Sequence, residues 1–436
     1  MRVISRVAEW LSKEHWLIGA SIARISLGCW AVYYLVLHWP VRHTLLGPDG
    51  VWPHEKFLED TFLNLFQLSP SPVYFDVVYH LAIAVAIAYA LGLWSRLMGV
   101  LQWAMIWSIQ DRNPFLGDGG DNIMRIALLF LILVNTGAYF SLDAASRVQS
   151  ANSPFQRFRA SVSNLLRPSL ALVHNFGVFL IIAQLCLLYS STGLYKVMGE
   201  LWQNGTALYY ILRVDEYSWP GVAEVLYRNP YLVVGGTYAT VFFELLFTPS
   251  LFHKWTRYLA MLAGFVFHMG IAMFMGLITF GWSMVSYYPL LVTDKEYKAL
   301  GTWLRERLSL KVFYDGWCPV CTKSIRWLAQ LDLLSLIQFV SFRDRSVTEL
   351  CRLDMARAER RIQSLAPSGK IREGMDVLLQ LSLRVILLWP VLPLLLVGRL
   401  LAGQRAYDAL ASRRLILVPG ACDRHCSAEI SPVGHR

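Results

Sequence analysis

Long apolar runs fill the sequence from its start to about residue 293, and they constrain the fold more than any other feature. A helix needs about 20 apolar residues to cross a bilayer, because its backbone polar groups must be satisfied within the segment. The sequence therefore predicts a polytopic α-helical membrane bundle of about eight spans over residues 1–293. The candidate spans are 16–37, 73–95, 97–110, 122–140, 174–195, 231–250, 257–275 and 277–292, the third and last being short.

The composition agrees with a membrane protein and argues against a nucleic-acid-binding protein. Hydrophobic residues make up 56% of the chain and charged residues 16%, outside the usual balance of soluble proteins. The formal net charge is +10, but Lys and Arg are scattered between apolar runs and form no basic stripe. We therefore expect membrane lipid around the body and no nucleic-acid partner.

The charges in the loops predict which side of the membrane each part of the chain faces. Basic loops stay cytoplasmic; linker 141–173 is rich in Arg, whereas loop 38–71 is mainly acidic. With the basic N-terminus inside, an even number of spans places everything after Asp294 inside as well. We expect an integral protein of the inner (cytoplasmic) membrane with a cytoplasmic C-terminal domain.

After Asp294 the pattern changes to short mixed elements. Residues 311–315 (KVFYD) and 336–342 (LIQFVSF) predict buried strands, separated by a helix from Pro319 to Leu331. Residues 364–380 predict a hairpin followed by a helix. We expect a linker at 294–310 and a thioredoxin-like α/β domain at 311–436. The inner face of the helix is predicted to hold Ile325, Leu328 and Ala329.

The apolar run 377–402 is long enough for a ninth span. Arg384, Pro390 and Pro393 interrupt it, and proline breaks helices. This pattern favours two short packed helices over a span.

Cys318 and Cys321 in VFYDGWCPVC form the clearest chemical motif. Cys318 lies where a strand ends and a helix begins, so the positive end of the helix dipole favours its thiolate and should lower its pKa. Cys321, one turn later, is placed to resolve a mixed disulfide. The alternative is a zinc site, but the strand-to-helix context favours redox chemistry, and we predict no metal. The other zinc ligands would come from Cys422, His425 and Cys426.

The segments YDGWCPVC, SGKIREGMDVLL and YDALASRR, within about 311–418, resemble the DCC family of small thiol-disulfide oxidoreductases. The resemblance implies Asp315 beside the active site, Cys318 as the nucleophile and Cys321 as the resolving cysteine. In the cytosol, where thiols are kept reduced, such a pair acts as a reductant or a relay. A protein or peptide thiol is the expected partner.

Ionisable residues inside apolar runs indicate a polar site in the membrane body, because charges at lipid depth usually face a bundle interior or a wet cavity. For any one of them alone, structural pairing is favoured, as for Asp121 with Arg125 one turn later. In DRNPFLGDGGDNIMR (111–125), a helix start is the safer account of Asp121. The residues concerned are Arg24, His80, Asp121, Arg125, Glu244 and His268.

The stretch YSSTGLYKVMGELWQNGTALYY (189–210) is the second informative segment. Lys196 either snorkels to the interface or, when partly buried, acts as a base. Trp202 either forms the wall of an apolar pocket or belongs to an interfacial aromatic belt.

These two segments, with RISLG (24–28), FFELLF (242–247) and FHMGIAMF (267–274), resemble the HTTM family, related to the vitamin K-dependent γ-carboxylases, over about 10–292. The resemblance implies that Lys196 matches the base that deprotonates the reduced quinone in those carboxylases. The matching pattern is Gly193, Lys196, Trp202 and Gly205.

The same resemblance implies a quinone (vitamin K-like) or another lipophilic small molecule as the ligand. Carboxylation itself is not expected, since we find no counterpart of the large lumenal domain of the carboxylases. The candidate substrate-binding residues are Asp121, Arg125, Trp202, Glu244 and His268.

Two functions follow from these features. The first is a membrane thiol-disulfide oxidoreductase whose dithiol exchanges electrons while the body binds a lipophilic molecule. The alternative is a maturation or export partner for a secreted peptide, with the CxxC domain as a redox accessory. Transport ranks last, because no inverted repeat is apparent.

Overall fold

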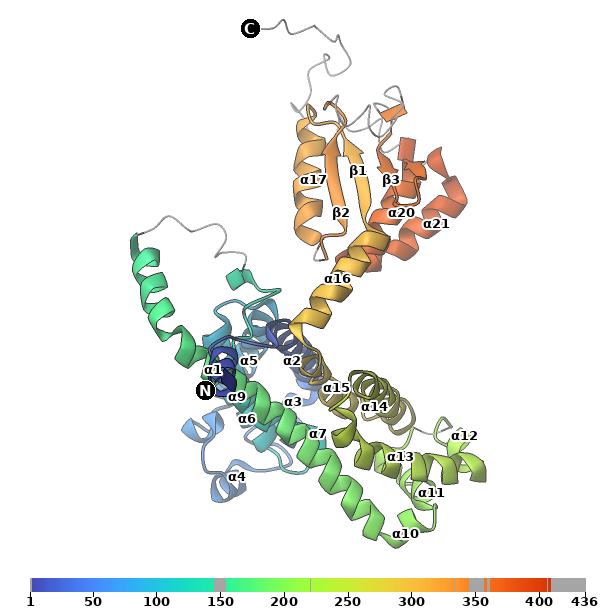
Figure 1. Cartoon of the computed structure of the whole chain (residues 1–436). Helices are drawn as coiled ribbons and strands as arrows, with labels where there is room; N and C mark the ends of the chain where they lie inside the picture. The colour runs from blue at the N-terminus through green and yellow to red at the C-terminus, as the bar shows by residue number, and fades with distance from the viewer. Residues whose placement is uncertain are drawn as a thin grey trace, which may run out of the picture. The chain divides into compact units, whose positions relative to one another are not determined.

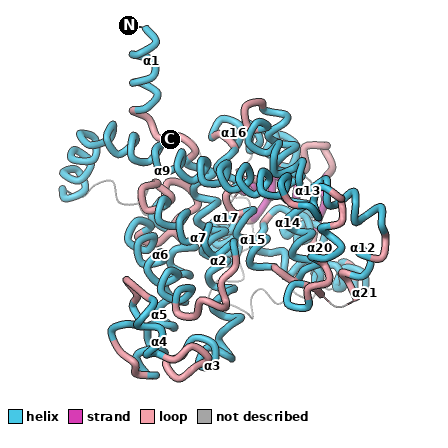
Figure 2. The backbone as a smooth tube through the Cα atoms, turned by 90° about the horizontal axis from the view of Figure 1, so that it is seen from below, coloured by secondary structure: helices cyan, strands magenta, loops and turns pink. Residues whose placement is uncertain are grey.

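The computed structural model describes residues 2–144, 154–219, 221–332, 334–344, 357–358, 361–405 and 407–408. The chain divides into two compact units, Met1–Asp294 and Lys295–Arg436. Helices make up most of the described backbone (Figure 2). The described strands all belong to the second unit.

The described part of the first unit consists of helices joined by loops and turns and contains no strand. Its elements are α1 (Arg2–Leu11), α2 (Leu17–His38), η1 (Trp39–Val41), α3 (Arg42–Leu46), α4 (His54–Asp60), η2 (Leu65–Leu68), α5 (Pro72–Leu91), α6 (Ser95–Asp111), α7 (Gly119–Leu131), α9 (Pro154–Met198), α10 (Glu200–Gln203), α11 (Ala207–Ile211), η3 (Asp215–Tyr217), α12 (Glu224–Tyr227), α13 (Pro230–Ser250), α14 (Lys254–Met275), α15 (Ile278–Val285) and η4 (Tyr288–Leu291).

Five helical segments of the described chain are long and apolar enough to cross a membrane, which is consistent with an integral membrane protein. They coincide with five of the eight predicted spans. The other three correspond to α6, α7 and α15, of 17, 13 and 8 residues. At about 1.5 Å per residue these rise less than the roughly 30 Å of a hydrocarbon core. The count of eight therefore remains a prediction. The five segments are Leu17–Leu46, Pro72–Leu91, Leu166–Met198, Pro230–Ser250 and Lys254–Met275.

Close helix packing builds the body. α2 packs on α5, and α9, α13, α14 and α15 follow one another in contact. A Cβ added at Gly28 would lie 2.7 Å from the Ala90 Cβ, so this glycine lets α2 and α5 approach closely, as small residues do in membrane bundles. Buried Trp30, Tyr79 and Phe247 fill the core.

Asp294 ties the end of the first unit to its beginning. The carboxylate accepts hydrogen bonds from the backbone N–H groups of Leu17, at 3.1 Å, and Ile18, at 2.8 Å. These donors belong to the first turn of α2, where helical N–H groups have no partner within the helix. A residue far along the chain thus caps the first predicted span.

The second unit contains a small mixed sheet (Figure 1). The sheet order is β2-β1-β3-β4, with β1 parallel to β2 and antiparallel to β3, and β3 antiparallel to β4. α17 forms the crossover that a parallel pair requires. The elements are α16 (Asp294–Leu308), β1 (Leu310–Tyr314), α17 (Pro319–Leu331), β2 (Ile337–Ser341), β3 (Gln363–Leu365), β4 (Ile371–Glu373), α20 (Met375–Arg384), η5 (Ile386–Val391) and α21 (Leu392–Ala402).

β1 is buried on both faces, as its apolar sequence predicts. Leu310 and Val312 join a core cluster that includes Val377 of α20, whereas Phe313 belongs to a separate cluster with Phe342. The bounds of the predicted strand, helix and strand are confirmed to within one residue.

The predicted inner face of α17 needs one correction. Ile325 is buried and Leu328 half-buried, but Ala329 is exposed. The buried stripe is narrow because only part of this short helix packs on the small sheet.

The structure also tests the predicted hairpin, the apolar run 377–402 and the linker 294–310. The hairpin is present as β3 and β4, with Gly369 at φ 77° in its turn. The run 377–402 forms α20 and α21 joined by η5, which contains Pro390, so the prediction of two short helices is confirmed. The predicted linker 294–310 is largely the 15-residue helix α16.

Candidate functional site

Cys318 and Cys321 lie at the junction of β1 and α17. Cys318 is the N-cap residue of α17 and Pro319 is in its first turn. The Cys321 N–H donates to the Cys318 sulfur at an N···Sγ distance of 3.5 Å, and Cys318 is 9% exposed. A helix N-terminus and a backbone donor both favour a sulfur anion at this position.

Asp315 lies at the end of β1 and is held by Arg343. The carboxylate accepts from Arg343 Nε at 3.0 Å and Nη2 at 2.9 Å, and from the Trp317 N–H at 3.0 Å. Partial burial acts to raise the pKa of Asp315, but the hydrogen bonds and charge of Arg343, with backbone donors, outweigh it and hold that pKa below its ordinary value. The guanidinium also stacks 4.5 Å from the centre of the Trp317 ring.

Sequence reasoning missed Arg343. It directly follows β2, and β2 is parallel to β1, so the two strands deliver their carboxyl ends to the same edge of the sheet. The parallel pairing of the two strands was therefore the feature that could have placed Arg343 beside Asp315. Gly316 permits the close approach, because a Cβ there would overlap the Ser341 hydroxyl at the end of β2.

The first unit contains a cavity of about 350 Å³ lined by residues of α7, α9, α10, α11, α13, α14 and α15. Four candidate residues from the sequence line it together: Lys196, Trp202, Glu244 and His268. They come from four separate helices, so only the tertiary fold brings them together.

Lys196 pairs with Glu244 in this cavity. Its Nζ donates to Glu244 Oε1 at 2.9 Å and Oε2 at 2.8 Å, and it lies 5.1 Å from the centre of the Trp202 ring. The two charged side chains are 20% and 7% exposed. Lys196 therefore points at a buried partner rather than away from the bundle. Gly193 allows this pairing, because a Cβ there would already lie 3.2 Å from the Glu244 Cβ.

A second polar group, built from Tyr189, His268 and Tyr288, adjoins the cavity, which its first two members line. The Tyr189 hydroxyl lies 2.7 Å from His268 Nε2 and 2.8 Å from the Tyr288 hydroxyl. His268 is 1% exposed, and its Nδ1 has no hydrogen-bond partner among the described residues. Sequence reasoning missed both tyrosines, although Tyr189 lies two turns before Lys196 on the same face of α9.

Comparison with known proteins identifies the C-terminal part of the chain. Residues 312–418 match the family described as DCC1-like thiol-disulfide oxidoreductase. This part is a DCC1-like domain. The match includes Asp315, Cys318 and Cys321, which agrees with the resemblance drawn from the motif.

Two curated relatives come from Bacillus subtilis (strain 168). The uncharacterized protein YitO is 23% identical over 240 residues, which cover 54% of this chain and 72% of YitO. The sporulation-delaying protein SdpB is 24% identical over 218 residues, which cover 49% of this chain and 62% of SdpB. No solved structure matches the chain. The HTTM resemblance and the peptide-maturation alternative remain predictions.

Arg361 lies just before β3 and pairs with β4 and with Asp408, which is near the end of the matched region. Its Nε donates to Asp408 at 2.8 Å and its Nη1 to Glu373 at 3.0 Å. The Ile362 N–H donates to the Tyr407 hydroxyl at 3.2 Å. Tyr407 and Asp408, the first two residues of the segment YDALASRR, thus hold the start of β3.

The other polar candidates lie outside the cavity lining. Asp121 and Asp118 form a capping box at the start of α7, and Asp121 Oδ1 accepts from Gln110 Nε2 at 2.6 Å. The helix-start interpretation of Asp121 is therefore confirmed. The Arg125 guanidinium lies 5.3 Å from the centre of the Trp107 ring. Substrate binding by Asp121 and Arg125 remains a prediction.

Arg24 and His80 make structural contacts. Arg24 Nη1 donates to the Thr136 carbonyl at 2.9 Å, and Trp39 Nε1 donates to His80 Nε2 at 3.0 Å. Neither residue lines the cavity.

Within the described ranges no cluster of His, Cys, Asp or Glu is suited to a metal ion. The alternative zinc ligands Cys422, His425 and Cys426 lie outside the described residues.

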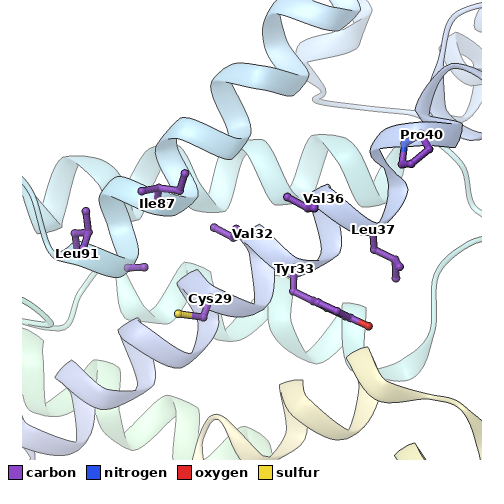
Figure 3. A pocket seen from close by; sticks show the side chains of 9 residues that line it. Cys29, Val32, Tyr33, Val36, Leu37, Pro40, Ile87 and Leu91 are labelled. Atoms are coloured by element: carbon purple, nitrogen blue, oxygen red, sulfur yellow. The ribbon is translucent and has the colours of Figure 1, made fainter. Parts of the chain in front are cut away.

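A larger hollow of about 720 Å³ lies between α2 and α5. Figure 3 shows side chains from both helices, among them Cys29 and Tyr33, with apolar Val32, Ile87 and Leu91. It brings together no acid or base of the kind found around Lys196.

Proposed function

We propose that this protein is a membrane-anchored thiol-disulfide oxidoreductase in which Cys318 is the nucleophile and Cys321 the resolving cysteine. The observation that carries the proposal is the placement of Cys318 as the N-cap of α17, where its sulfur accepts the Cys321 N–H. The match of this region to an oxidoreductase family supports it.

The reaction follows from the two sulfurs. The Cys318 thiolate attacks a substrate disulfide, forms a mixed disulfide and releases one substrate thiolate. The Cys321 thiolate then attacks the Cys318 sulfur and releases the second. The protein dithiol loses two electrons and two protons in total, and the substrate disulfide gains them. Asp315, held by Arg343, fixes the loop between β1 and the nucleophile.

The sheet supports a thioredoxin-like fold for this domain. A strand, a helix with the CxxC pair at its start, a parallel strand and an antiparallel hairpin follow in that order. The domain is further proposed to face the cytoplasm, where it acts as a reductant or relay.

The membrane body is proposed to bind a lipophilic small molecule, such as a quinone, in the cavity around Lys196 and His268. The volume lies in the range of small-molecule sites, and buried polar groups at an apolar wall are typical of them. This arrangement supports a role for Lys196 in binding or proton transfer.

Cys318→Ser tests the dithiol. In the full-length protein the change should abolish disulfide reductase activity, measured with a small-molecule disulfide and a thiol reductant. Cys321→Ser should instead trap a mixed disulfide on Cys318, visible by mass spectrometry of the intact protein. Cys29→Ser, which changes a thiol on α2, is the matched control and should keep full activity. Full activity of Cys318→Ser would refute the assignment of the nucleophile.

A further inference from the structure

We propose that the DCC1-like domain docks on an anionic bilayer surface through η5 and α21, so that lipid covers an apolar face that the described part of the domain leaves exposed. Neither the dithiol exchange nor the cavity of the first unit requires this contact, so it goes beyond the proposed function.

α21 is the outer helix of a layered arrangement. α20 packs on the sheet, because its Val377 and Leu381 belong to the core cluster that contains Leu310 and Val312 of β1. α21 packs in turn on α20 and η5 (Figure 1). Arg399, the charged residue of α21, donates from Nε to Asp376 Oδ1 of α20 at 2.7 Å. The charge of α21 is thus used on the side that faces α20.

The opposite side of α21 is apolar and exposed. Leu392, Leu395 and Arg399 form the half-buried stripe toward α20. At 3.6 residues per turn, the exposed positions cover roughly 160° of the helix, and none of them is charged. A helix that is apolar all round is normally buried in a core or in a membrane. The exposed face, called here the outer face of α21, consists of Pro393, Leu394, Leu396, Val397, Leu400 and Leu401, the last two 84% exposed.

α21 is too short to cross the bilayer. Its 11 residues rise about 17 Å, against about 30 Å for a hydrocarbon core. Pro390 lies in η5, between α20 and α21, and proline prevents one continuous helix. A short helix with one apolar face can instead lie in the plane of the interface, with that face among the lipid chains.

Charge favours lipid over a protein as the partner. The second unit, Lys295–Arg436, contains 22 Lys and Arg against 13 Asp and Glu, so it carries +9 of the formal net charge of +10. Basic segments are attracted to anionic headgroups, whereas a second copy of the domain would bring the same charge and repel it. Trp389 of η5 is exposed beside this face, and tryptophan favours the boundary between lipid and water.

The chain also keeps the domain near the bilayer. α16 has 15 residues and begins at Asp294, whose carboxylate accepts from the first turn of α2, a candidate span. Arg384 Nε donates to the Leu308 carbonyl at 2.6 Å, which fixes the end of α16 to the end of α20, directly before η5. A tether of about 22 Å gives the bilayer a high effective concentration at the domain.

The test uses a photoreactive lipid and the full-length wild-type protein, one copy per nanodisc. The discs are made of phosphatidylglycerol, part of which carries a diazirine in its acyl chain, and labelled peptides are identified by mass spectrometry. Peptides of α21 should carry lipid, as should those of α5, a candidate span that serves as the internal standard. Peptides of α17, where Trp327 is also exposed, should carry none.

Lipid charge tests the choice of partner. In phosphatidylcholine discs with the same diazirine, the label on α21 relative to α5 should fall at least about fivefold, the effect expected from one basic side chain near an anionic surface. Raising the salt concentration in the phosphatidylglycerol discs should act in the same direction. Equal labelling of α21 in the two lipids would refute an anionic surface as the partner.

Val397→Glu combined with Leu401→Glu tests the outer face of α21. The label on α21 should fall at least about tenfold, because two aliphatic side chains no longer enter lipid. Trp327→Glu combined with Ile371→Glu, at exposed positions of α17 and β4, adds the same charge elsewhere and should leave that label unchanged. Both proteins should keep wild-type disulfide reductase activity, which shows that the domain is folded.

Three other results would overturn the docking. Lipid on α5 but none on α21 in the wild type would refute it, while membrane anchoring and the Cys318 assay would stand. Equal labelling of the two double variants would show that the outer face of α21 does not make the contact. Absence of lipid on α21, with slower hydrogen exchange of α21 in vesicles that hold several copies than in single-copy discs, would assign the face to a second copy.

Discussion

The contact between Asp315 and Arg343 shows how single residues order the redox loop. The two side chains are 19% and 13% exposed, so their hydrogen bonds are largely shielded from water. Removing Arg343 leaves a carboxylate that burial then disfavours. The loop between β1 and Cys318 depends on this partner.

Arg343→Met should lower the free energy of unfolding of the DCC1-like domain by about 1–3 kcal/mol at neutral pH. The pKa of Asp315 is held low in the folded protein, so its stabilising contribution is complete above the unfolded value of about 3.9 and is lost as pH falls through the folded value. In the variant this contribution is absent, so the difference in stability between the wild type and Arg343→Met should be complete at neutral pH and should shrink as pH falls below about 3.9. Hydrogen exchange of β1 and α17 peptides from neutral pH down to about pH 3 measures that difference.

Arg372→Met, at an exposed position on β4, is the control for this series. Identical exchange profiles for the two variants would contradict the role assigned to Arg343.

Gly316→Ala should destabilise the same loop by about 1–2 kcal/mol, because the new methyl group overlaps Ser341 and forces it to move. Gly398→Ala, in α21 with no atom within 4 Å of an added Cβ, should be neutral or slightly stabilising. Thermal unfolding of both variants, read from domain peptides by hydrogen exchange, separates overlap from a general effect of alanine.

At the level of elements, the pairing of α9 with α13 positions the cavity. Gly193 lies one turn before Lys196 and faces Glu244 and Leu245 of α13. Small residues at such crossings let membrane helices approach. The distance between these helices therefore sets whether Lys196 reaches its partner.

Gly193→Val should push α9 from α13 and cost about 1–3 kcal/mol of stability through overpacking. It should also weaken binding of any cavity ligand, because Lys196 and Glu244 separate. Gly235→Val, on α13 with open space around an added Cβ, is the control. Thermal unfolding in nanodiscs and binding of a quinone report the two effects, and equal behaviour of the variants would argue against close packing at Gly193.

Local signals explain which elements could be predicted from the sequence. β1 and α17 were placed within a residue, because an apolar strand, Pro319 and the CxxC pair mark the junction. The predicted span 277–292 instead contains the eight-residue α15 and the short η4, since Gly276 ends α14 and Pro289 prevents a continuous helix. Hydropathy alone does not detect such breaks.

The candidate site likewise contains residues that local sequence patterns reveal and residues that only the tertiary fold brings in. Gly193, Lys196 and Trp202 lie close in sequence, and their spacing suggested a site. Arg343 and Tyr288 join their partners only through sheet pairing and helix packing, which no local pattern encodes.

At the scale of the whole molecule, the loop charges predict the orientation of the chain in the membrane. The acidic loop 38–71 is predicted outside and the DCC1-like domain inside. This arrangement decides which thiol pool meets Cys318.

A membrane-impermeant maleimide should label the Cys318 and Cys321 pair in inverted vesicles and leave it unlabelled in intact cells. The experiment uses a background with Cys29→Ser and Cys186→Ser, so that thiols of the first unit do not react. Asp49→Cys, at an exposed position of loop 38–71, should show the opposite pattern. Labelling of the CxxC pair from outside would reverse the proposed topology and the direction of electron flow with it.

The hydrogen bonds that Asp294 accepts from the start of α2 also have a consequence for the order of folding during synthesis. Leu17 and Ile18 leave the ribosome long before Asp294, so the first span must enter the membrane with its leading amides still unsatisfied by this carboxylate. The contact between the two ends of the body can form only after Asp294 has been synthesised, immediately before translation of the thiol domain begins. Asp294→Ala should therefore delay closure of the bundle more than it slows insertion of the individual helices.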